Sequence, residues 1–322
     1  MRTKLLFETV LAAGAILLAS CGDNSLGPNP ATTSTHQAAL ESNTWLVRHN
    51  VPYDWTGMVT AAVPNAAGQT ILYAIGGSTP AGACLGRVQA YNLATDTWKS
   101  RTDLLAALCG INGAAVVNGK IYVAGGAPTA KGPVASLYMY DPTTNVWTQK
   151  RSMPEPGSGG ISGVIKGRLY VVTITKTGAK FFRYAPSTDT WVRLPSTDYW
   201  WLGGGGGVIN DRLYLIAQAV KMFDPATNQW TTKGQLPGDL HGASAVVRRQ
   251  LYIFGADTRP GREDWGIFVY DPIANTWTRK RLLATLKDSY NPLGASKVFL
   301  NGEPRVEVVG GARPENNLQY IP

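Results

Sequence analysis

Hydrophobic and polar residues alternate along most of the chain in short runs, and these runs recur at a nearly constant spacing. Each run ends in an aromatic residue, a turn of Pro, Asn, Asp and Thr follows, and the next run opens with tryptophan. Alternation with a period of two is typical of half-buried strands, so each unit predicts two strands joined by a tight turn. The five units are YNLATDTW, YDPTTNVW, YAPSTDTW, FDPATNQW and YDPIANTW, which begin at Tyr91, Tyr140, Tyr184, Phe223 and Tyr270.

A second pattern lies between these units. Apolar residues, a two-residue turn and a strand with a tyrosine recur in AAVVNGKIYVAGG, SGVIKGRLYVV, GGVINDRLYLI and SAVVRRQLYIFGA. Asn118-Gly119 in the first of them is a strong hairpin signal, because both residues tolerate positive φ. ILYAIGG at 71–77 and VEVVGG at 306–311 belong to the same set. One full repeat therefore predicts four strands.

This four-stranded repeat resembles the kelch repeat of β-propellers, whose period is about 50 residues. The tryptophans from Trp45 to Trp277 recur about every 46 residues, so 43–322 holds six units. The final segment, NNLQYIP, carries Tyr320 without a following tryptophan, and NTW at 43–45 supplies the missing strand. The resemblance implies an all-β, six-bladed kelch-type β-propeller in which the N-terminal strand joins the C-terminal blade and closes the ring.

The composition agrees with this fold and includes few residues of the types that metal and cofactor sites use. Glycine (36) and proline (20) are frequent, and 44% hydrophobic residues allow a large core. Only three histidines and three cysteines are present, so we expect no metal site and no cofactor. In particular, the ligand set of galactose-oxidase-like kelch enzymes cannot be matched. The glycines of 203–207 lack the Lys-Ser/Thr of a phosphate-binding loop, and we expect them on an innermost strand, where small residues let the blades crowd around the axis.

The first twenty residues predict export. Arg2 and Lys4 precede a short apolar run that is too brief to span a bilayer, and the run ends in Leu-Ala-Ser before Cys21. This ending resembles the lipobox of bacterial lipoproteins, which implies cleavage of 1–20 and a lipid on Cys21. An ordinary cleaved signal peptide, with Cys21 incidental, is the alternative. The Ser/Thr/Pro/Asn-rich segment 21–42 predicts a flexible tether.

The lipobox resemblance places the protein in the bacterial cell envelope, tethered to a membrane through its lipid. Gly22 stands where an aspartate would act as an inner-membrane retention signal in some bacteria, which favours the outer membrane or cell surface. The whole chain has 30 basic and 21 acidic residues, but it has no basic stripe with interleaved aromatics. We therefore expect no nucleic-acid partner.

Two further cysteines lie in the predicted propeller. Cys84 falls between the second and third strands of the first blade, and Cys109 falls between that blade and the next. These two kinds of loop emerge on the same face of a propeller, and leftover cysteines usually pair in an oxidising compartment. We expect a Cys84–Cys109 disulfide, with two buried thiols as the alternative.

Propellers generally bind their ligands on this face, because its loops vary while the blades hold them rigid. Aromatic rings beside charged groups suit sugars, which stack on the rings and hydrogen-bond to the charges. Several tryptophans here fall outside the repeat, although they could equally cap the core or fill gaps between blades. The candidate ligand-binding residues are Trp55, Trp200, Trp201, His241, Arg262, Trp265 and Arg313.

The leading hypothesis is a lipid-anchored binding protein that is not an enzyme and that recognises a glycan or an envelope protein. The alternative is a sugar mutarotase, because exported six-bladed kelch proteins include the N-acetylneuraminate epimerase family. Glu263, Arg262, Asp288 and His241 could supply an acid and a base, but they match no motif of that family. A third reading is a structural partner in an envelope assembly.

Overall fold

The computed structural model describes residues 42–129, 131–197, 205–259, 264–281, 283, 294–310 and 317–322, residue 264 by its backbone alone. The chain divides into two units, Met1–Ala39 and Leu40–Pro322, and every described residue lies in the second. The described residues form 24 β-strands and contain no helix. None of them therefore forms a helix that is long and apolar enough to cross a membrane.

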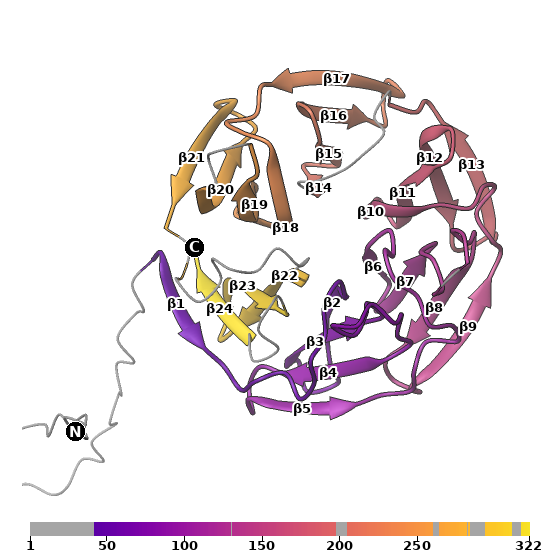
Figure 1. Ribbon diagram of the computed structural model, residues 1–322, viewed down its shortest axis with the longest axis vertical. Helices are drawn as coiled ribbons and strands as arrows, with labels where there is room; N and C mark the ends of the chain where they lie inside the picture. The colour runs from indigo at the N-terminus through magenta and orange to yellow at the C-terminus, as the bar shows by residue number, and fades with distance from the viewer. Residues whose placement is uncertain are drawn as a thin grey trace, which may run out of the picture. The chain divides into compact units, whose positions relative to one another are not determined.

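The strands form six antiparallel four-stranded sheets, which are arranged as blades around a central axis (Figure 1). In blades I to V the strands pair in sequence order, and the first strand of each blade lies next to the first strands of its neighbours around the axis. This arrangement confirms the all-β, six-bladed kelch-type propeller that the repeats predict.

The strand bounds follow the repeat closely. Blade I consists of β2 (Val59–Pro64), β3 (Thr70–Ile75), β4 (Val88–Asn92) and β5 (Thr97–Ser100). Blade II consists of β6 (Ala114–Val117), β7 (Lys120–Ala124), β8 (Leu137–Asp141) and β9 (Val146–Lys150). Blade III consists of β10 (Ser158–Ile165), β11 (Arg168–Thr175), β12 (Gly178–Ala185) and β13 (Thr190–Leu194).

The remaining blades complete the ring. Blade IV consists of β14 (Gly206–Ile209), β15 (Arg212–Ile216), β16 (Val220–Asp224) and β17 (Gln229–Gly234). Blade V consists of β18 (Leu240–Val247), β19 (Gln250–Asp257), β20 (Asp264–Asp271) and β21 (Thr276–Lys280). Blade VI consists of β22 (Gly294–Leu300), β23 (Glu303–Val309), β24 (Asn317–Ile321) and β1 (Thr44–Val47).

Two-residue turns join the first and second strands of most blades. Asn118 and Gly119 have φ of 49° and 73°, which is the geometry that a type I′ turn requires and that the sequence predicts. Positive φ at both turn residues recurs in 166–167, 210–211, 248–249 and 301–302. These turns fix the strand register, so the hydrophobic face of each strand points between blades.

A latch built from three side chains joins blade II to blade I, and parts of it recur in other blades. In blade II, the Tyr140 hydroxyl donates to Asn145 Oδ1 at 2.6 Å, and the same oxygen accepts the backbone N–H of Thr102 at 3.0 Å. The indole N–H of Trp147 donates to the Thr102 carbonyl at 2.9 Å. Asn145 has φ of 57°, a left-handed conformation that asparagine tolerates better than most residues.

Parts of the same latch recur around the ring. Tyr91 with Asp96, Tyr184 with Asp189, and Tyr270 with Asn275 repeat the hydroxyl contact. The indole N–H groups of Trp98, Trp191, Trp230 and Trp277 each donate to a carbonyl of the preceding blade, at 2.7 to 3.1 Å. The tyrosine, turn and tryptophan of the repeat therefore hold neighbouring blades together as well as forming each hairpin.

The first strands of all six blades line a small central cavity of about 210 Å³. Small residues are required there, because a Cβ on Gly113 would lie 2.9 Å from the backbone nitrogen of Ser162 in the next blade. A Cβ on Gly205 would lie 2.5 Å from Ser244 Oγ. Gly205 and Gly206 belong to the glycine run of 203–207, so this part of the run has the packing role that the sequence predicts.

Strand β1 closes the ring by pairing with β24, with Thr44 opposite Ile321 and Val47 opposite Leu318. At the seam between blades VI and I, Arg48 Nε donates to the Tyr91 hydroxyl at 3.0 Å, and its Nη2 donates to the Leu93 carbonyl at 2.9 Å. The blade that carries both termini is therefore tied to blade I by side chains as well as by the chain.

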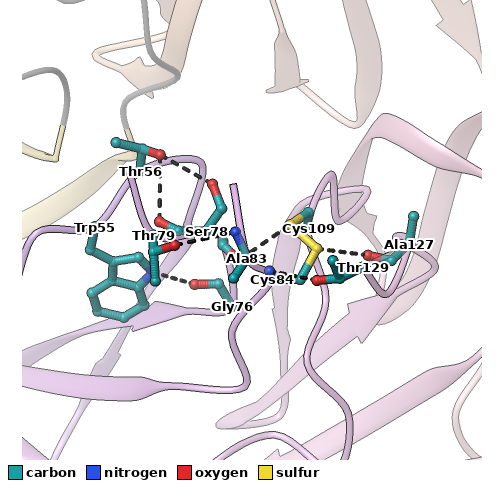
Figure 2. The surroundings of a disulfide bond; sticks show 11 residues. Trp55, Thr56, Gly76, Ser78, Thr79, Ala83, Cys84, Cys109, Ala127 and Thr129 are labelled. Carbon is teal, nitrogen blue, oxygen red and sulfur yellow. Dashed lines mark hydrogen bonds between the residues drawn. A yellow bond between two sulfur atoms is a disulfide. The ribbon is translucent and has the colours of Figure 1, made fainter. Parts of the chain in front are cut away.

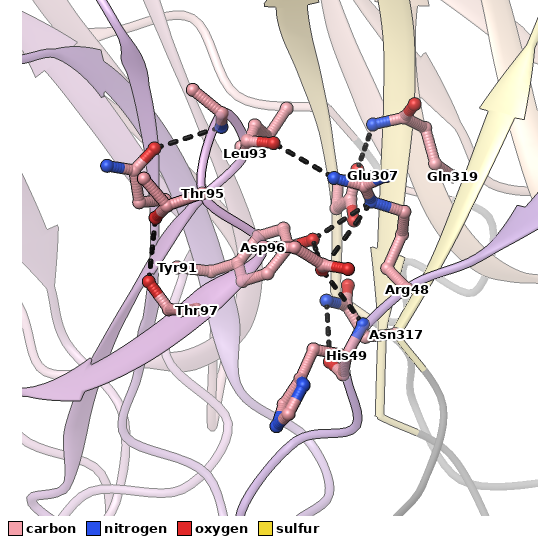
Figure 3. Close-up of polar contacts among 12 residues, drawn as sticks. Arg48, His49, Tyr91, Leu93, Thr95, Asp96, Thr97, Glu307, Asn317 and Gln319 are labelled. Carbon is pink, nitrogen blue, oxygen red and sulfur yellow. Dashed lines mark hydrogen bonds and ion pairs between the residues drawn. The ribbon is translucent and has the colours of Figure 1, made fainter.

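A cluster of buried polar side chains lies at the same seam (Figure 3). Glu307 on β23 is fully buried, and its Oε2 accepts a hydrogen bond from Gln319 Nε2 at 2.9 Å. Gln319 Oε1 in turn accepts from Arg305 Nη1 at 2.6 Å. Burial raises the pKa of Glu307 to about 8, and the Gln319 hydrogen bond and the positive charges of Arg48 and Arg305 oppose that rise.

Candidate functional site

The end of the propeller that carries the loops between second and third strands, and the connections from one blade to the next, is called here the loop face. Two described parts of it hold charged or aromatic side chains. The first part lies over blades I and II and includes the two cysteines. The second part lies over blades IV and V and includes His241.

Cys84 and Cys109 are joined by a disulfide, with their Cα atoms 5.1 Å apart (Figure 2). The backbone N–H of Cys84 also donates to Thr129 Oγ1 at 2.8 Å, and Cys109 pairs with Ala127 through a short β-bridge. Cys84 lies in the β3–β4 loop, and Thr129 and Ala127 lie in the β7–β8 loop. The disulfide therefore fastens the β3–β4 loop of blade I to the connection between blades I and II. The contacts with Thr129 and Ala127 attach the β7–β8 loop of blade II to the same place.

Trp55 does not reach the surface of this face, which corrects the prediction that it contacts a ligand. Its side chain is 1% exposed and packs among Val51, Met58 and Leu72 in the core between blades VI and I. Its indole N–H donates to the carbonyl of Gly76, as Figure 2 shows. A ring enclosed in this way cannot stack on a sugar, so Trp55 caps the core.

Tyr53 is the exposed aromatic residue nearest to Trp55 in the sequence. It is 42% exposed, and the guanidinium of Arg87 lies over its ring with Cζ 3.9 Å from the ring centroid. A cation above an aromatic face is attracted by the ring's quadrupole, which holds both side chains in place. The pair presents a positive charge and an aromatic edge beside the disulfide-linked loops.

The second part of the loop face is organised by Asp257, a carboxylate with a side chain that is 6% exposed. Arg259 Nε donates to both of its oxygens at 2.9 Å, and the backbone N–H of Asp239 donates to Oδ1 at 2.9 Å. The Arg259 hydrogen bonds hold the pKa of Asp257 below its usual range. Gly238 makes this possible, because a Cβ there would lie 2.3 Å from the carboxylate carbon.

His241 stands beside this anchored loop. Its Nε2 lies 3.6 Å from Asp239 Oδ1, and the two side chains are 31% and 53% exposed. An imidazole and a carboxylate at the surface can together donate hydrogen bonds to a ligand and accept hydrogen bonds from it. The geometry therefore retains His241 as a candidate contact residue.

Trp265 lies at the loop-face end of β20, opposite Ala256 of β19. Its ring is half-buried and packs against the hydrophobic core that blades V and VI share. Part of this ring therefore supports packing. Trp200, Trp201, Arg262, Arg313 and the lipidation candidate Cys21 lie outside the described residues.

Sequence reasoning missed the residues that shape this face from within. Asp257 was not singled out, although an acidic residue at the end of an apolar strand is a signal of a buried ion pair. Tyr53 and Arg87 lie on the predicted face, but a cation–π contact between different loops has no local sequence signature. Within the described ranges, no group of three or more His, Cys, Asp or Glu side chains could hold a metal ion.

The sequence matches the Kelch motif over residues 62–105 and 112–154, which are the segments that form blades I and II. The chain is 27% identical over 191 residues to Beta-scruin of Limulus polyphemus, covering 57% of this chain and 18% of that protein. It is 30% identical over 134 residues to Kelch-like protein 24 of Rattus norvegicus, covering 41% and 20%. For Kelch-like protein 34 of Homo sapiens the identity is 28% over 185 residues, covering 52% and 27%.

The chain thus spans about a fifth to a quarter of the length of these relatives. The Kelch motif matches and the six four-stranded blades together show that the fold is a six-bladed kelch-type β-propeller.

Proposed function

We propose that this protein is an exported, lipid-anchored binding protein that recognises a partner through its loop face. The observation that carries the proposal is the disulfide between Cys84 and Cys109, which fastens a loop of blade I to the connection between blades I and II at one end of a closed ring. A rigid frame with fixed loops suits recognition, because little conformational entropy is lost when a partner binds.

A protein partner is favoured over a glycan. Kelch-repeat propellers generally mediate protein–protein interactions. The described loop face offers charged groups, namely the Arg87 guanidinium and the Asp239 carboxylate. It also offers the exposed ring of Tyr53, over which Arg87 lies. Arginine and tyrosine are enriched at the centres of protein interfaces. Trp55, which would have favoured sugar stacking, is buried.

Export and lipid attachment are supported by the lipobox resemblance that ends at Cys21 and by the disulfide, which persists in oxidising compartments. The test is fractionation of bacterial cells that express the full chain or its Cys21→Ser variant. We expect the parent in the membrane fraction and the variant outside it. The double variant Cys84→Ser, Cys109→Ser is the matched control and should fractionate as the parent does. A Cys21→Ser variant that stays in the membrane would refute lipid attachment.

The binding proposal is tested by charge reversal on each end of the propeller. Arg87→Glu and Asp239→Lys alter the loop face, and Lys166→Glu and Asp211→Lys alter the turns at the opposite end. Partners captured from envelope extracts and an immobilised glycan panel are measured with all four variants. We expect at least a tenfold loss of affinity for the loop-face variants alone. Loss confined to the opposite-end variants would overturn the proposal, and binding to glycans alone would replace the protein partner by a sugar.

A further inference from the structure

A groove with an unusual lining lies between blades I and II, at the end opposite the loop face. Its volume is about 520 Å³. Val63, Ile71 and Tyr73 of blade I form an apolar floor, and the turn at 118–119 of blade II forms one wall. A space of this size accommodates a small organic molecule.

Ala90 is the smallest side chain at its position in the six blades. This position precedes the aromatic residue of each repeat, and Ala90 lines the groove from β4. Its methyl group takes up less of the groove than the side chains at the same position of the other blades would. The equivalent residues of the other five blades are Met139, Arg183, Met222, Val269 and Gln319.

The charge of the lining is one-sided. Three cationic side chains, Lys99, Arg101 and Lys120, line the groove, and no carboxylate does so among the described residues. Lys120 pairs with Asp141 just outside the groove. That ion pair and its hydrogen bond hold the pKa of Asp141 well below its usual range.

Arg101 and Lys99 differ from Lys120 in having no carboxylate partner among the described residues. The Nε of Arg101 is buried and has no hydrogen-bond partner among the residues that the structure describes. A buried cationic donor without a partner is costly, and an anion in the groove would remove that cost. The charge of Arg101 also acts on Tyr73, where it opposes the rise in the phenol pKa that burial produces.

The corresponding groove between blades III and IV differs in having carboxylates in its lining. Its volume is about 340 Å³, and Asp211 and Asp224 line it together with its cations. Arg212 Nη2 lies 3.0 Å from Asp224 Oδ2, and Lys166 Nζ lies 3.9 Å from Asp211 Oδ2. Two of its four cations, Lys166 and Arg212, therefore have a carboxylate partner in the lining, whereas no carboxylate among the described residues lines the groove between blades I and II.

We infer that the groove between blades I and II binds an amphipathic organic anion, with its apolar body over Ala90 and Tyr73 and its carboxylate, sulfonate or phosphate at Arg101. Lys99, which lies opposite Ala90 in the β4–β5 pairing, supplies a second positive charge to the lining. Arginine suits such a group because its guanidinium donates in a planar fork. The inference does not depend on the loop face, which lies at the other end of the propeller.

The test uses two probes that differ by one charged group, 8-anilinonaphthalene-1-sulfonate and the neutral N-phenyl-1-naphthylamine. Both are titrated calorimetrically into the intact chain carrying Cys21→Ser, which removes the predicted acylation. We expect the sulfonate to bind at one site per chain and at least tenfold more tightly than the neutral probe. Arg101→Gln should weaken only the sulfonate, by at least tenfold. Arg183→Gln, which removes the same charge from the other groove, should change its affinity by less than twofold.

Ala90→Met fills the groove with the residue that blades II and IV carry at this position, and it should weaken sulfonate binding at least tenfold. Ala90→Val, which copies Val269 of blade V, is the second variant should the methionine disturb folding. Absence of sulfonate binding, or binding that neither Ala90 variant weakens, would overturn the site. Binding that Ala90→Met abolishes and Arg101→Gln leaves unchanged would overturn the assignment of an anion.

Discussion

The hydroxyl of Tyr320 donates a hydrogen bond to Asn43 Oδ1 at 2.7 Å, although the two residues are 277 positions apart. It is the same contact that Tyr140 makes with Asn145 within one turn of blade II. In blade VI no turn joins the two strands, because β24 lies at the C-terminal end of the propeller segment and β1 at its N-terminal end. The tyrosine–asparagine contact of the latch therefore also ties together the two ends of the propeller segment.

Asn43→Ala should lower the free energy of unfolding by about 2 kcal/mol. It removes this hydrogen bond, and it places alanine at a positive φ that alanine tolerates less well than asparagine. Asn43 has φ of 65°. Asn43→Gly is the control, since glycine tolerates that φ and isolates the hydrogen bond, with an expected loss of about 1 kcal/mol. Urea denaturation measures both. Equal losses for the two variants would contradict a strained backbone at Asn43.

The buried carboxyl of Glu307 should make stability depend on pH in a defined direction. Its pKa of about 8 in the folded protein lies above the ordinary value of 4.5, so the folded state binds this proton more tightly than the unfolded chain. The contribution of the neutral carboxyl is fully present below about pH 4.5 and is lost as pH rises towards 8. The free energy of unfolding should therefore fall across this window.

Glu307→Gln should remove that part of the pH dependence, because a neutral amide keeps a hydrogen-bonding group beside Gln319. Near pH 5 the variant should match the parent within about 1 kcal/mol, and near pH 9 it should be the more stable by at least about 2 kcal/mol. Urea denaturation at the two pH values provides the comparison. Glu303→Gln, at the exposed start of β23, is the control. Parallel pH profiles for the parent and Glu307→Gln would exclude a role for this carboxyl.

Reduction of the Cys84–Cys109 bridge should cost about 3 kcal/mol, as expected for a loop of this length. The cysteines are 25 positions apart. The replacement Cys84→Ser with Cys109→Ser should show the same loss without reductant. Intact mass after alkylation, with and without prior reduction, gives the thiol count directly. Two alkylated cysteines in the unreduced protein would rule out the bridge.

Trp55 and Tyr53 should respond very differently to truncation. Trp55→Ala empties a buried site and should lower the free energy of unfolding by about 3 to 5 kcal/mol. Tyr53→Ala removes a side chain that is 42% exposed and should cost no more than about 1 kcal/mol. Thermal and urea denaturation of both variants make the comparison. A small loss for Trp55→Ala would return this residue to the surface and to the candidate ligand site.

Much of the propeller could be predicted from the sequence because each repeat encodes its contacts locally. The aromatic residue, the Asx turn and the tryptophan lie within eight positions, so one short segment specifies a hairpin and a latch. Ring closure was predictable for the same reason, since Tyr320 and Trp45 are two halves of one such segment. The position of the glycines near the axis could be predicted because they align with the innermost strands of other blades.

The candidate site was less predictable because its determinants are single residues in contact across blades. Trp55 falls outside the repeat, which suggested exposure, but the space between blades VI and I encloses it. Glu307 lies inside the apolar run VEVV, and the run gave no indication that Gln319 and Arg305 would meet it. Arg87 and Tyr53 come from different loops. Such contacts depend on the three-dimensional arrangement of the blades.

The pairing of β1 with β24 also sets the order in which the protein can fold. During synthesis β1 is made before every other strand of the propeller, yet its partner is the strand made last. Blades I to V can form as their strands emerge, because each pairs with its neighbours in sequence. The ring itself cannot close until β24 is released, so its closure is a late step that joins distant parts of the chain.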